Sequence, residues 1–185
     1  MELGVDFIFR PLQPTDKLKP FKSGAAEFQP LKTFLLDQAE NFQTALVAQT
    51  FVCSLLDNDV DIGRIIAYIT LTCSEIDIRD GIELADCPHA HRYDSMPALK
   101  IARLAVDSRY QRGHGLGRLL VDLAVACAYD KIAPYSGCRF LVTDAKRKAM
   151  DFYHKVGFTL LDTPTNHQNE SPIMFLDLFK NLDTV

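Results

Sequence analysis

The sequence predicts an α/β (α+β) fold, in which a central mixed, twisted sheet of about six to seven strands is flanked by helices on both faces. Apolar runs with the composition of strands recur along the chain, and turn residues join two of them as a β-hairpin. After that hairpin, strand-like and helix-like segments alternate, which favours a mixed sheet. A length of 185 residues suits one domain, so residues 1–185 are expected to form a single domain.

The first half of the chain contains the predicted hairpin. Residues 5–12 predict a strand that prolines end, and residues 31–42 carry apolar side chains at helical spacing. Residues 44–56 are rich in β-branched and aromatic side chains and predict a strand. The turn chemistry of residues 57–63 joins this strand to its expected partner, residues 64–73.

The second half alternates between strands and helices. Residues 74–97 predict an irregular excursion with a helical turn, and residues 98–106 a strand. A helix of about four turns follows, because its apolar residues form one stripe; they are Leu116, Leu119, Leu120, Leu123, Ala124 and Cys127. Further segments predict a buried strand, a helix ended by Gly157 and two final strands; they are residues 138–145, 145–156, 158–161 and 173–179.

Composition excludes several classes of protein. The formal charge of −4 and the pI near 5.7 give no electrostatic reason for nonspecific binding to nucleic acid or membrane. Five cysteines without CxxC spacing favour reduced thiols and a cytoplasmic location over a disulfide framework. No signal peptide is expected, because the first residues carry an early acid and no basic n-region, and no apolar run approaches the roughly 18 residues of a membrane span.

Three glycines, Gly113, Gly115 and Gly117, lie between a predicted strand and a predicted helix. A strand, a glycine-rich turn and a helix N-terminus together aim backbone N–H groups at one anion. The pattern is neither the P-loop string GxxxxGK[ST] nor the dinucleotide fingerprint GxGxxG, because the third glycine comes one residue early. We therefore expect an anion site of another kind, rather than a tight turn that only needs a positive φ.

Two motifs carry a resemblance to a known family. Residues 112–117, RGHGLG, fit an R-x-x-G-x-G string, and here the sequence resembles the GNAT superfamily of acetyl-CoA-dependent N-acetyltransferases, in which this string cradles the CoA pyrophosphate. Residues 149–158 resemble that family's A-x-x-[LF]-Y-x-x-x-GF signature. The close match covers residues 99–161. The strings F-x-S-G near Phe21, RLAVD, VTDAK and FY most resemble a branch that includes toxin-type acetyltransferases, which modify the α-amine of aminoacyl-tRNA.

The resemblance implies a set of acetyl-CoA contacts. Leu104, Ala105 and Val106 would line the site with backbone groups beside the pantetheine arm. The amides of Arg112, Gly113, His114, Gly115, Leu116 and Gly117 would hold the pyrophosphate, and Arg112 and Arg118 would add positive charge. Arg118 is equally expected as a solvated residue on the outer face of its helix. His114 is expected to contribute its amide rather than its side chain.

The second motif implies an acid. Tyr153 matches the family tyrosine that protonates the departing CoA thiolate, although a core aromatic is the alternative. Phe152 and Ala149 are expected to pack under the cofactor or in the core.

The motif also departs from the family pattern at one position. Many members have an asparagine where this chain has Lys146, so Asp144 is a candidate for part of that role. Residues 146–148 would meet the 3′-phosphate of CoA or an acceptor nucleic acid, or form a solvated helix face, which we favour.

The sequence shows no strong general base. Glu75, at the end of a predicted strand, is the candidate. Deprotonating a lysine at pH 7 costs about 4.6 kcal/mol, but deprotonating an α-amine costs only about 1 kcal/mol. A chain without a strong base is therefore slightly better suited to an α-amine acceptor.

Cys87, His89 and His91 suggest a zinc site, but no second ligand cluster accompanies them, so no metal is expected. We favour a loop at the rim of the acceptor pocket for this string. An acyl-enzyme formed on a Cys–His pair is a further alternative to direct transfer.

Three functions are consistent with the sequence. The leading one is acetyl transfer from acetyl-CoA to a primary amine acceptor. The second is the same chemistry in a toxin acting on aminoacyl-tRNA, against which the net charge of −4 counts mildly. The third is a non-catalytic CoA-binding module, which the presence of Tyr153 disfavours. A homodimer is a possible assembly, and no membrane partner is expected.

Overall fold

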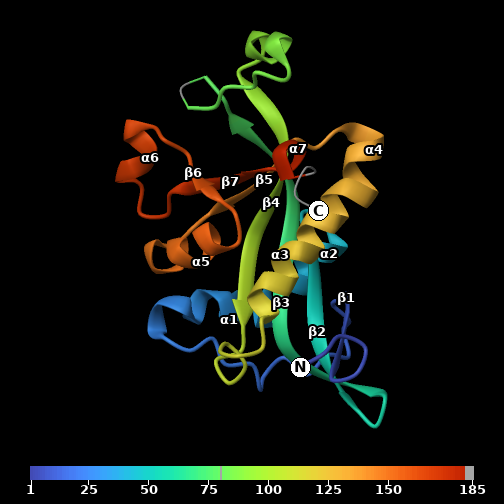
Figure 1. Ribbon diagram of the computed structural model, residues 1–185. Coiled ribbons are helices and arrows are strands. Elements are labelled where there is room, and N and C mark those ends of the chain that lie inside the picture. The colour runs from blue at the N-terminus through green and yellow to red at the C-terminus, as the bar shows by residue number, and fades with distance from the viewer. Residues whose placement is uncertain (80, 182–185) are drawn as a thin grey trace. The chain divides into compact units, whose positions relative to one another are not determined.

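A computed structural model describes residues 1–79 and 81–181. Seven strands form one sheet in the order β1-β2-β3-β4-β5-β7-β6, in which β4 and β5 are parallel and the other recorded pairs are antiparallel (Figure 1). The mixed seven-stranded sheet and its helices confirm the expected fold class. The strands are β1 Phe7–Pro11, β2 Gln49–Asp57, β3 Val60–Asp77, β4 Ser95–Val106, β5 Phe140–Asp144, β6 Thr159–Leu160 and β7 Ile173–Asp177.

The helices vary widely in length. Most are short, and α3 spans 12 residues. The α-helices are α1 Gln29–Asp37, α2 Ala39–Thr44, α3 Leu116–Cys127, α4 Ala133–Ser136, α5 Met150–Lys155, α6 Pro164–Gln168 and α7 Leu178–Asn181. Short 3-10 turns cover Ala26–Phe28, Pro88–Arg92 and Arg147–Ala149, and a π turn covers Ala128–Ile132.

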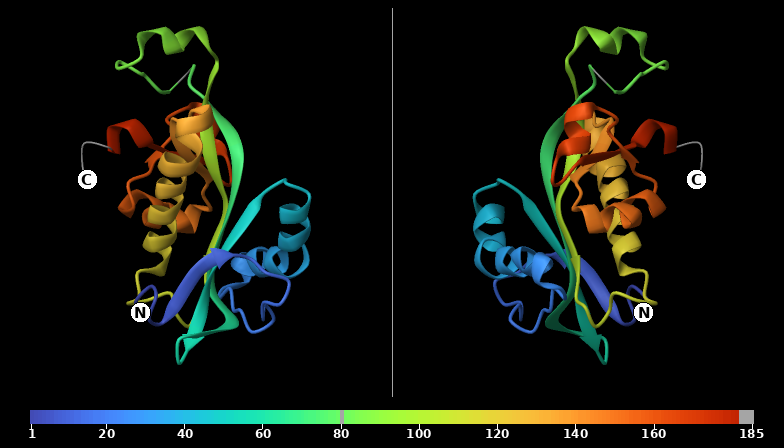
Figure 2. Two further views of the ribbon diagram at one scale, coloured as in Figure 1. Left: turned by 90° about the vertical axis from the view of Figure 1, so that its right-hand side faces the viewer. Right: turned by 90° about the vertical axis from the view of Figure 1, so that its left-hand side faces the viewer.

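The chain forms two compact units, each with its own apolar core. The first unit comprises Met1–Thr72 and Ala102–Val121, and α1 and α2 lie on one face of its strands (Figure 2). Its core is Leu12, Phe21, Phe34, Leu35, Ala39, Val52, Ile65, Tyr68 and Ala105. The second unit comprises Cys73–Ile101 and Asp122–Val185, with a core of Ile76, Ile78, Leu84, Ala90, Ala98, Phe140 and Val142.

The predicted hairpin is β2–β3. Asn58 and Asp59 have φ of 49° and 62°, the left-handed backbone that a two-residue type I′ turn needs at both positions. Asparagine and aspartate tolerate this conformation better than most residues, which explains the turn. Register then runs from Asp57↔Val60 to Gln49↔Leu71, with bulges near Ser54.

The predicted helix and strand before this hairpin are partly wrong. One helix over residues 31–42 was expected, but Gln38, with φ −129°, divides it into α1 and α2. The following strand begins at Gln49 rather than at residue 44. Val47 and Ala48 donate their N–H groups to the carbonyl of Phe42 and end the helix, so they cannot join the sheet ladder.

The excursion between β3 and β4 is shorter than expected. β3 runs on to Asp77 and β4 begins at Ser95, so the irregular part covers residues 78–94. The expected helical turn is the 3-10 turn Pro88–Arg92. Asp80 lies outside the described residues.

Three differences occur in the second unit. The chain stays helical after α3 through the π turn and α4, until Gly137 adopts φ +71°. The strand expected to reach residue 179 ends at Asp177, whose Oδ1 accepts a hydrogen bond from Phe179 N (3.1 Å) at the start of α7. The unexpected α6 begins because the Thr163 hydroxyl accepts from Asn166 N (3.2 Å).

Gly157 ends the helical segment of residues 147–155 as predicted. Its φ is +96°, and Phe158 N donates to the carbonyl of Tyr153 (2.9 Å). The segment itself is a 3-10 turn followed by α5, rather than one helix from residue 145. β6 includes only two of the four residues expected in that strand.

Candidate active site

A buried carboxylate organises the chain just after β4. Asp107 is 0 % exposed, and its carboxylate accepts hydrogen bonds from Lys22 N (3.0 Å) and from the N and Nε of Arg109 (3.0 and 2.9 Å). Arg109 Nη2 also donates to the carbonyl of Pro20 (2.8 Å). Burial opposes ionisation of Asp107, but these hydrogen bonds lower its pKa below the ordinary value. The ionised carboxylate thus holds residues 20–22 beside the end of β4, where the glycine loop begins.

The glycine loop, residues 112–115, is exposed and ends where α3 begins. Gly113 and Gly115 have φ of +78° and +66°, and no heavy atom lies within 4 Å of a Cβ built on either residue. Within residues 1–79 and 81–181, no backbone N–H from Gly113 to Gly117 donates to a protein group. The first recorded bond of the helix is Leu119 N to Gly115 O (3.0 Å). The loop therefore presents N–H groups without protein acceptors at the positive end of a helix, which is how proteins bind phosphate anions.

The charged and aromatic side chains predicted at this loop point to its exposed surface. Arg112, His114 and Arg118 are exposed. The ring of His114 lies 6.1 Å from that of Tyr110, centroid to centroid. A side chain on Gly113 or Gly115 would occupy the open space beside the N–H groups, so the residues present fit a diphosphate.

The strand before the loop continues beyond its pairing with β5. That ladder joins Ala98–Lys100 to Phe140–Val142, and β4 runs on through Leu104, Ala105 and Val106. Ala105 is buried in the core of the first unit, and its two neighbours are half-buried. The backbone groups predicted to line the pantetheine arm thus belong to the end of this strand.

Tyr153 lies on α5 in the second unit and is 6 % exposed. Its ring makes edge contacts with Phe152 and Phe158, at centroid distances of 5.1 and 5.2 Å. Burial raises the pKa of Tyr153, and a hydrogen bond with Thr143 acts in the opposite direction. The phenol is therefore protonated at neutral pH and has a proton to donate.

The other predicted residues near Tyr153 in sequence have varied surroundings. Asp144 forms an ion pair with Lys100 Nζ (2.5 Å), and it is partly exposed. Lys146, Ala149 and Phe152 are half-buried. In the KRK string, Arg147 Nη2 donates to the carbonyls of residues 167 and 169 (2.6 Å each), so the 3-10 turn before α5 is hydrogen-bonded to the segment of α6.

Glu75, the candidate base, is exposed on β3. Its Oε2 accepts a hydrogen bond from the Ser95 hydroxyl (2.7 Å). In the part of the chain that the structure describes, no recorded contact joins Glu75 to Tyr153. Glu75 remains a candidate on its residue type alone.

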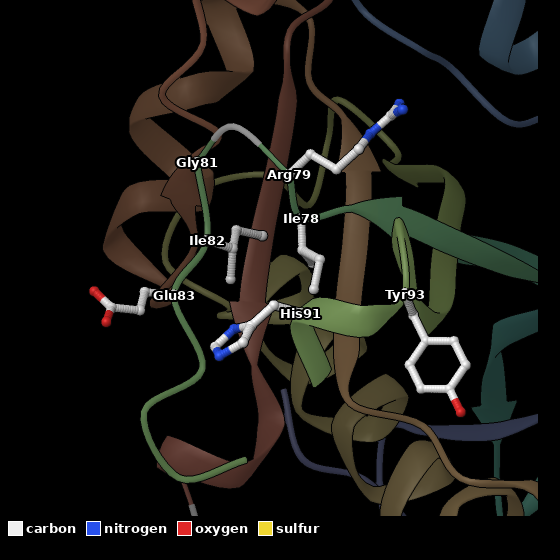
Figure 3. A pocket seen from close by; sticks show the side chains of 7 residues that line it. All are labelled: Ile78, Arg79, Gly81, Ile82, Glu83, His91 and Tyr93. Carbon is white, nitrogen blue, oxygen red and sulfur yellow. The ribbon is translucent and has the colours of Figure 1, made fainter. Parts of the chain in front are cut away.

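The excursion contains a pocket of about 550 Å³ (Figure 3). Ile78 and Ile82 form its apolar part, with His91 beside them, whereas the side chains of Glu83 and Tyr93 point away from that apolar centre. Cys87 and His89, the other members of the CPHAH string, are exposed and do not line the pocket. Across the described ranges, no three His, Cys, Asp or Glu side chains are grouped so as to hold a metal.

All five cysteines are free thiols. Burial raises the pKa of Cys53 to about 12, so that thiol is a poor nucleophile. Among the described residues, no hydrogen bond joins a cysteine to a histidine. Nothing in this arrangement supports an acyl-enzyme.

Comparison with known proteins identifies the family. A model of the acetyltransferase (GNAT) domain matches residues 49–160, more than half of the chain and including both predicted motifs. The chain belongs to the GNAT acetyltransferase family. It is therefore an acyltransferase with acetyl-CoA as its co-substrate.

Solved structures of toxin-type GNAT acetyltransferases have the same fold. A tyrosine-to-phenylalanine mutant of KacT has a TM-score of 0.80 at 19% identity, over 97% of this chain and 99% of that one. AtaT complexed with acetyl-methionyl-tRNAfMet has a TM-score of 0.79 at 21% identity, over 97% and 98% of the two chains. AtaTR bound with AcCoA has a TM-score of 0.71 at 21% identity, over 97% and 99%.

Two features of this GNAT chain were not predicted from its sequence. The buried Asp107 clamp lies in the quoted RLAVD string, yet nothing in a single sequence shows that its carboxylate caps a distant backbone N–H. Arg103 of the same string stacks on Phe34, a partner far away in sequence.

Within the described residues, no helix is long and apolar enough to span a bilayer.

Proposed function

We propose that this chain transfers the acetyl group of acetyl-CoA directly to a primary amine in a ternary complex, with Tyr153 as the general acid. The observation that carries the proposal is the open glycine loop at the start of α3. Its N–H groups have no protein acceptor among the described residues, and a Cβ would fill the space they face. A diphosphate would satisfy those donors, because anions bind at helix N-termini.

The remaining contacts follow the strand and the loop. Leu104–Val106 would align the pantetheine arm through their backbone groups, and Arg112 and Arg118 would add positive charge at the phosphates. Asp144 would contact the arm only if its ion pair with Lys100 opens, so its role is weaker than the sequence suggested. Ala149 and Phe152 would support the arm by packing, and Lys146 would contact it or a phosphate.

Direct transfer forms one bond and breaks one. The neutral amine nitrogen attacks the thioester carbonyl carbon, the C–S bond breaks, and the amine proton leaves through water or Glu75. A thiol of pKa about 8.5 is a stronger acid than a phenol of pKa about 10, so full proton transfer to the thiolate is uphill. The raised pKa of Tyr153 increases this difference. Tyr153 therefore acts by donating a hydrogen bond as charge develops on sulfur.

A second candidate is the α-amine of aminoacyl-tRNA as the acceptor. AtaT, which shares the fold over 97% of this chain, is complexed with acetyl-methionyl-tRNAfMet in its own structure. AtaT is also described as a toxin bound to the C-terminus of its antitoxin AtaR. The low cost of deprotonating an α-amine fits a site whose candidate base, Glu75, is an exposed carboxylate. An antitoxin partner and a homodimer belong to this proposal.

The test measures CoA thiol release from acetyl-CoA with and without acceptor. The acceptors are small amines, peptides and charged tRNAs, at equal concentration. Release that depends on an amine and yields the N-acetyl product supports the proposal, and the preferred acceptor decides between its two forms. Tight acetyl-CoA binding without amine-dependent release from any acceptor contradicts it and favours a non-catalytic CoA-binding module.

A further inference from the structure

A hollow of about 520 Å³ lies between α1 and β4 in the first unit. Its walls are the first turns of α1 with Gln38, and Ala102 and Arg103 of β4. Gln29, Thr33 and Gln38 put exposed amide and hydroxyl groups at its edge. None of the residues proposed to contact acetyl-CoA lines this hollow.

Arg103 is the cation of the hollow, and an aromatic ring holds it in place. Its guanidinium carbon lies 3.7 Å from the centroid of the Phe34 ring. Phe34 is 2 % exposed and makes an edge contact with Phe42, so the platform under the guanidinium is fixed. Stacking uses the face of the guanidinium and leaves its N–H edge available to a planar or tetrahedral anion.

The charge of Arg103 has no protein counterion. In residues 1–79 and 81–181, no carboxylate lies within ion-pair distance of it. The side chain is half-buried, and the partial loss of hydration lowers the pKa of its guanidinium. An arginine remains charged even so, and a partly desolvated cation without an anion is costly to maintain for packing alone. Arg10, Arg109 and Arg139, in contrast, each face carboxylates.

The position of the hollow along β4 points to the acceptor rather than the cofactor. In the proposed mode, the diphosphate lies at the glycine loop and the pantetheine arm runs back along Val106 to Leu104. The thioester end of the arm then points toward Arg103, the next residue of the strand. We propose that Arg103 is a specificity-determining residue that binds an anionic group, a carboxylate or a phosphate, of the amine acceptor; this inference rests on the proposed transferase function.

Two pairs of acceptors test this contact and separate the two sources of the anion. Glycine and glycinamide differ by a carboxylate. A 3′-aminoacyl adenosine 5′-phosphate and the corresponding aminoacyl adenosine differ by a phosphate. We expect Arg103→Gln to lower kcat/KM for the anionic member of at least one pair about tenfold or more, mainly through KM, with little effect on the neutral member. For each acceptor, kcat/KM of the variant is divided by that of the native chain, so the intrinsic reactivity of the amine cancels. The quotient for the anionic member is then compared with the quotient for the neutral one.

Lys32→Gln is the matched control. It removes a cation from α1, the helix that lines the hollow, at a residue that does not line it. It should leave both ratios near one. Arg103→Lys should restore part of the preference by charge but not all of it, because lysine lacks the planar stacking. Calorimetric binding of acetyl-CoA should be unchanged in Arg103→Gln, which shows that the variant is folded.

Product binding reads the same contact without turnover. N-acetylglycine and N-acetylglycinamide, and the N-acetyl forms of the aminoacyl nucleotide pair, are titrated into the CoA-bound protein. Arg103→Gln should weaken only an anionic product. Equal effects on both members of each pair in rate and in binding would overturn the role of Arg103. Absence of acetyl transfer from every acceptor, with the selective loss of anionic product binding intact, would instead contradict the transferase proposal alone.

Discussion

Tyr153 shows at the scale of one residue how burial prepares a group for chemistry. The side chain is nearly enclosed between aromatic rings, and its hydroxyl is kept protonated because burial raises its pKa. A general acid has to hold its proton until charge develops on the leaving group. Phenylalanine would keep the packing of the ring and remove only the hydroxyl.

Tyr153→Phe should therefore lower kcat about 10²–10⁴-fold and leave acetyl-CoA affinity nearly unchanged. Steady-state kinetics with a preferred acceptor and calorimetry with acetyl-CoA measure the two quantities. Tyr135→Phe is the control, since Tyr135 is 86% exposed. Unchanged kcat in the Tyr153 variant would remove this residue from the mechanism.

Asp107 stabilises the fold through its ionised form. Its folded pKa is depressed by hydrogen bonds from Arg109 and Lys22 that outweigh burial, so the unfolded chain binds its proton more readily than the folded one. The contribution is present above the unfolded pKa of about 3.9 and is lost as pH falls through the folded pKa.

Asp107→Asn should thus be less stable than the native chain by about 2 kcal/mol at pH 7, because a neutral amide accepts the hydrogen bonds of Lys22 N and Arg109 more weakly than a carboxylate does. Denaturant unfolding measures this difference. The gap between the two proteins should narrow as pH falls from 6 to 3. A gap that is constant over this range would show that the charge of Asp107 is not what stabilises the segment.

At the scale of elements, Arg139 connects three parts of the second unit. Its guanidinium forms ion pairs with Asp177 at the end of β7 (2.8 Å) and with Asp86 in the excursion (2.6 Å). It also stacks near Phe179 of α7, with 4.9 Å between the guanidinium carbon and the ring centroid. Asp177 is only 9 % exposed, so removing Arg139 would take its nearest cation from a buried carboxylate, and Lys180 Nζ, at 4.0 Å, is a more distant partner.

Arg139→Met keeps the aliphatic stem and removes the charge. We expect it to cost about 3 kcal/mol of stability and to speed proteolysis of residues 78–94. Thermal unfolding and limited proteolysis measure the two effects. Arg92→Met, an exposed arginine in the same excursion, should change neither. A native-like melting temperature for Arg139→Met would show that the ion pairs are not needed to hold the excursion.

Elements with strong local signals were predictable, and those decided by distant contacts were not. The β2–β3 turn follows from Asn58 and Asp59, and the end of α5 follows from Gly157, because each needs a left-handed backbone. The break at Gln38 and the late start of β2 depend on which donors end the helix, and α6 is held by Asn166, whose amide bonds the carbonyls of Leu161 and Ile173. A pattern of apolar residues does not show which hydrogen-bond donors and acceptors pair with one another.

The same limit applies to the candidate site. The glycine loop and the Tyr153 motif are contiguous strings, so their positions followed directly from the sequence. Asp107 and Arg103 act through Lys22 and Phe34, which the fold alone brings to them. Asp144 was predicted as a cofactor contact, but its ion pair with Lys100 weakens that role.

At the scale of the whole molecule, the fold resembles KacT and AtaT over nearly the full chain at about one identical residue in five. A burial pattern and a few turns are enough to specify a fold, and many sequences meet those requirements. Function is carried by fewer residues, and acceptor choice by fewer still. The family therefore identifies the acetyl donor, whereas Arg103 and its hollow carry the proposed choice of acceptor.

Calorimetry of acetyl-CoA binding to Gly115→Val, with Gly137→Val as the control, tests whether the glycine loop binds the CoA diphosphate. Both glycines have a positive φ, of +66° and +71°, and neither has an atom within 4 Å of an added Cβ, so each substitution strains the backbone without a steric clash. We predict that Gly115→Val loses acetyl-CoA binding, because valine fills the space that the phosphates need, and that Gly137→Val binds like the native chain. Native affinity for acetyl-CoA in folded Gly115→Val would contradict a phosphate site at the glycine loop.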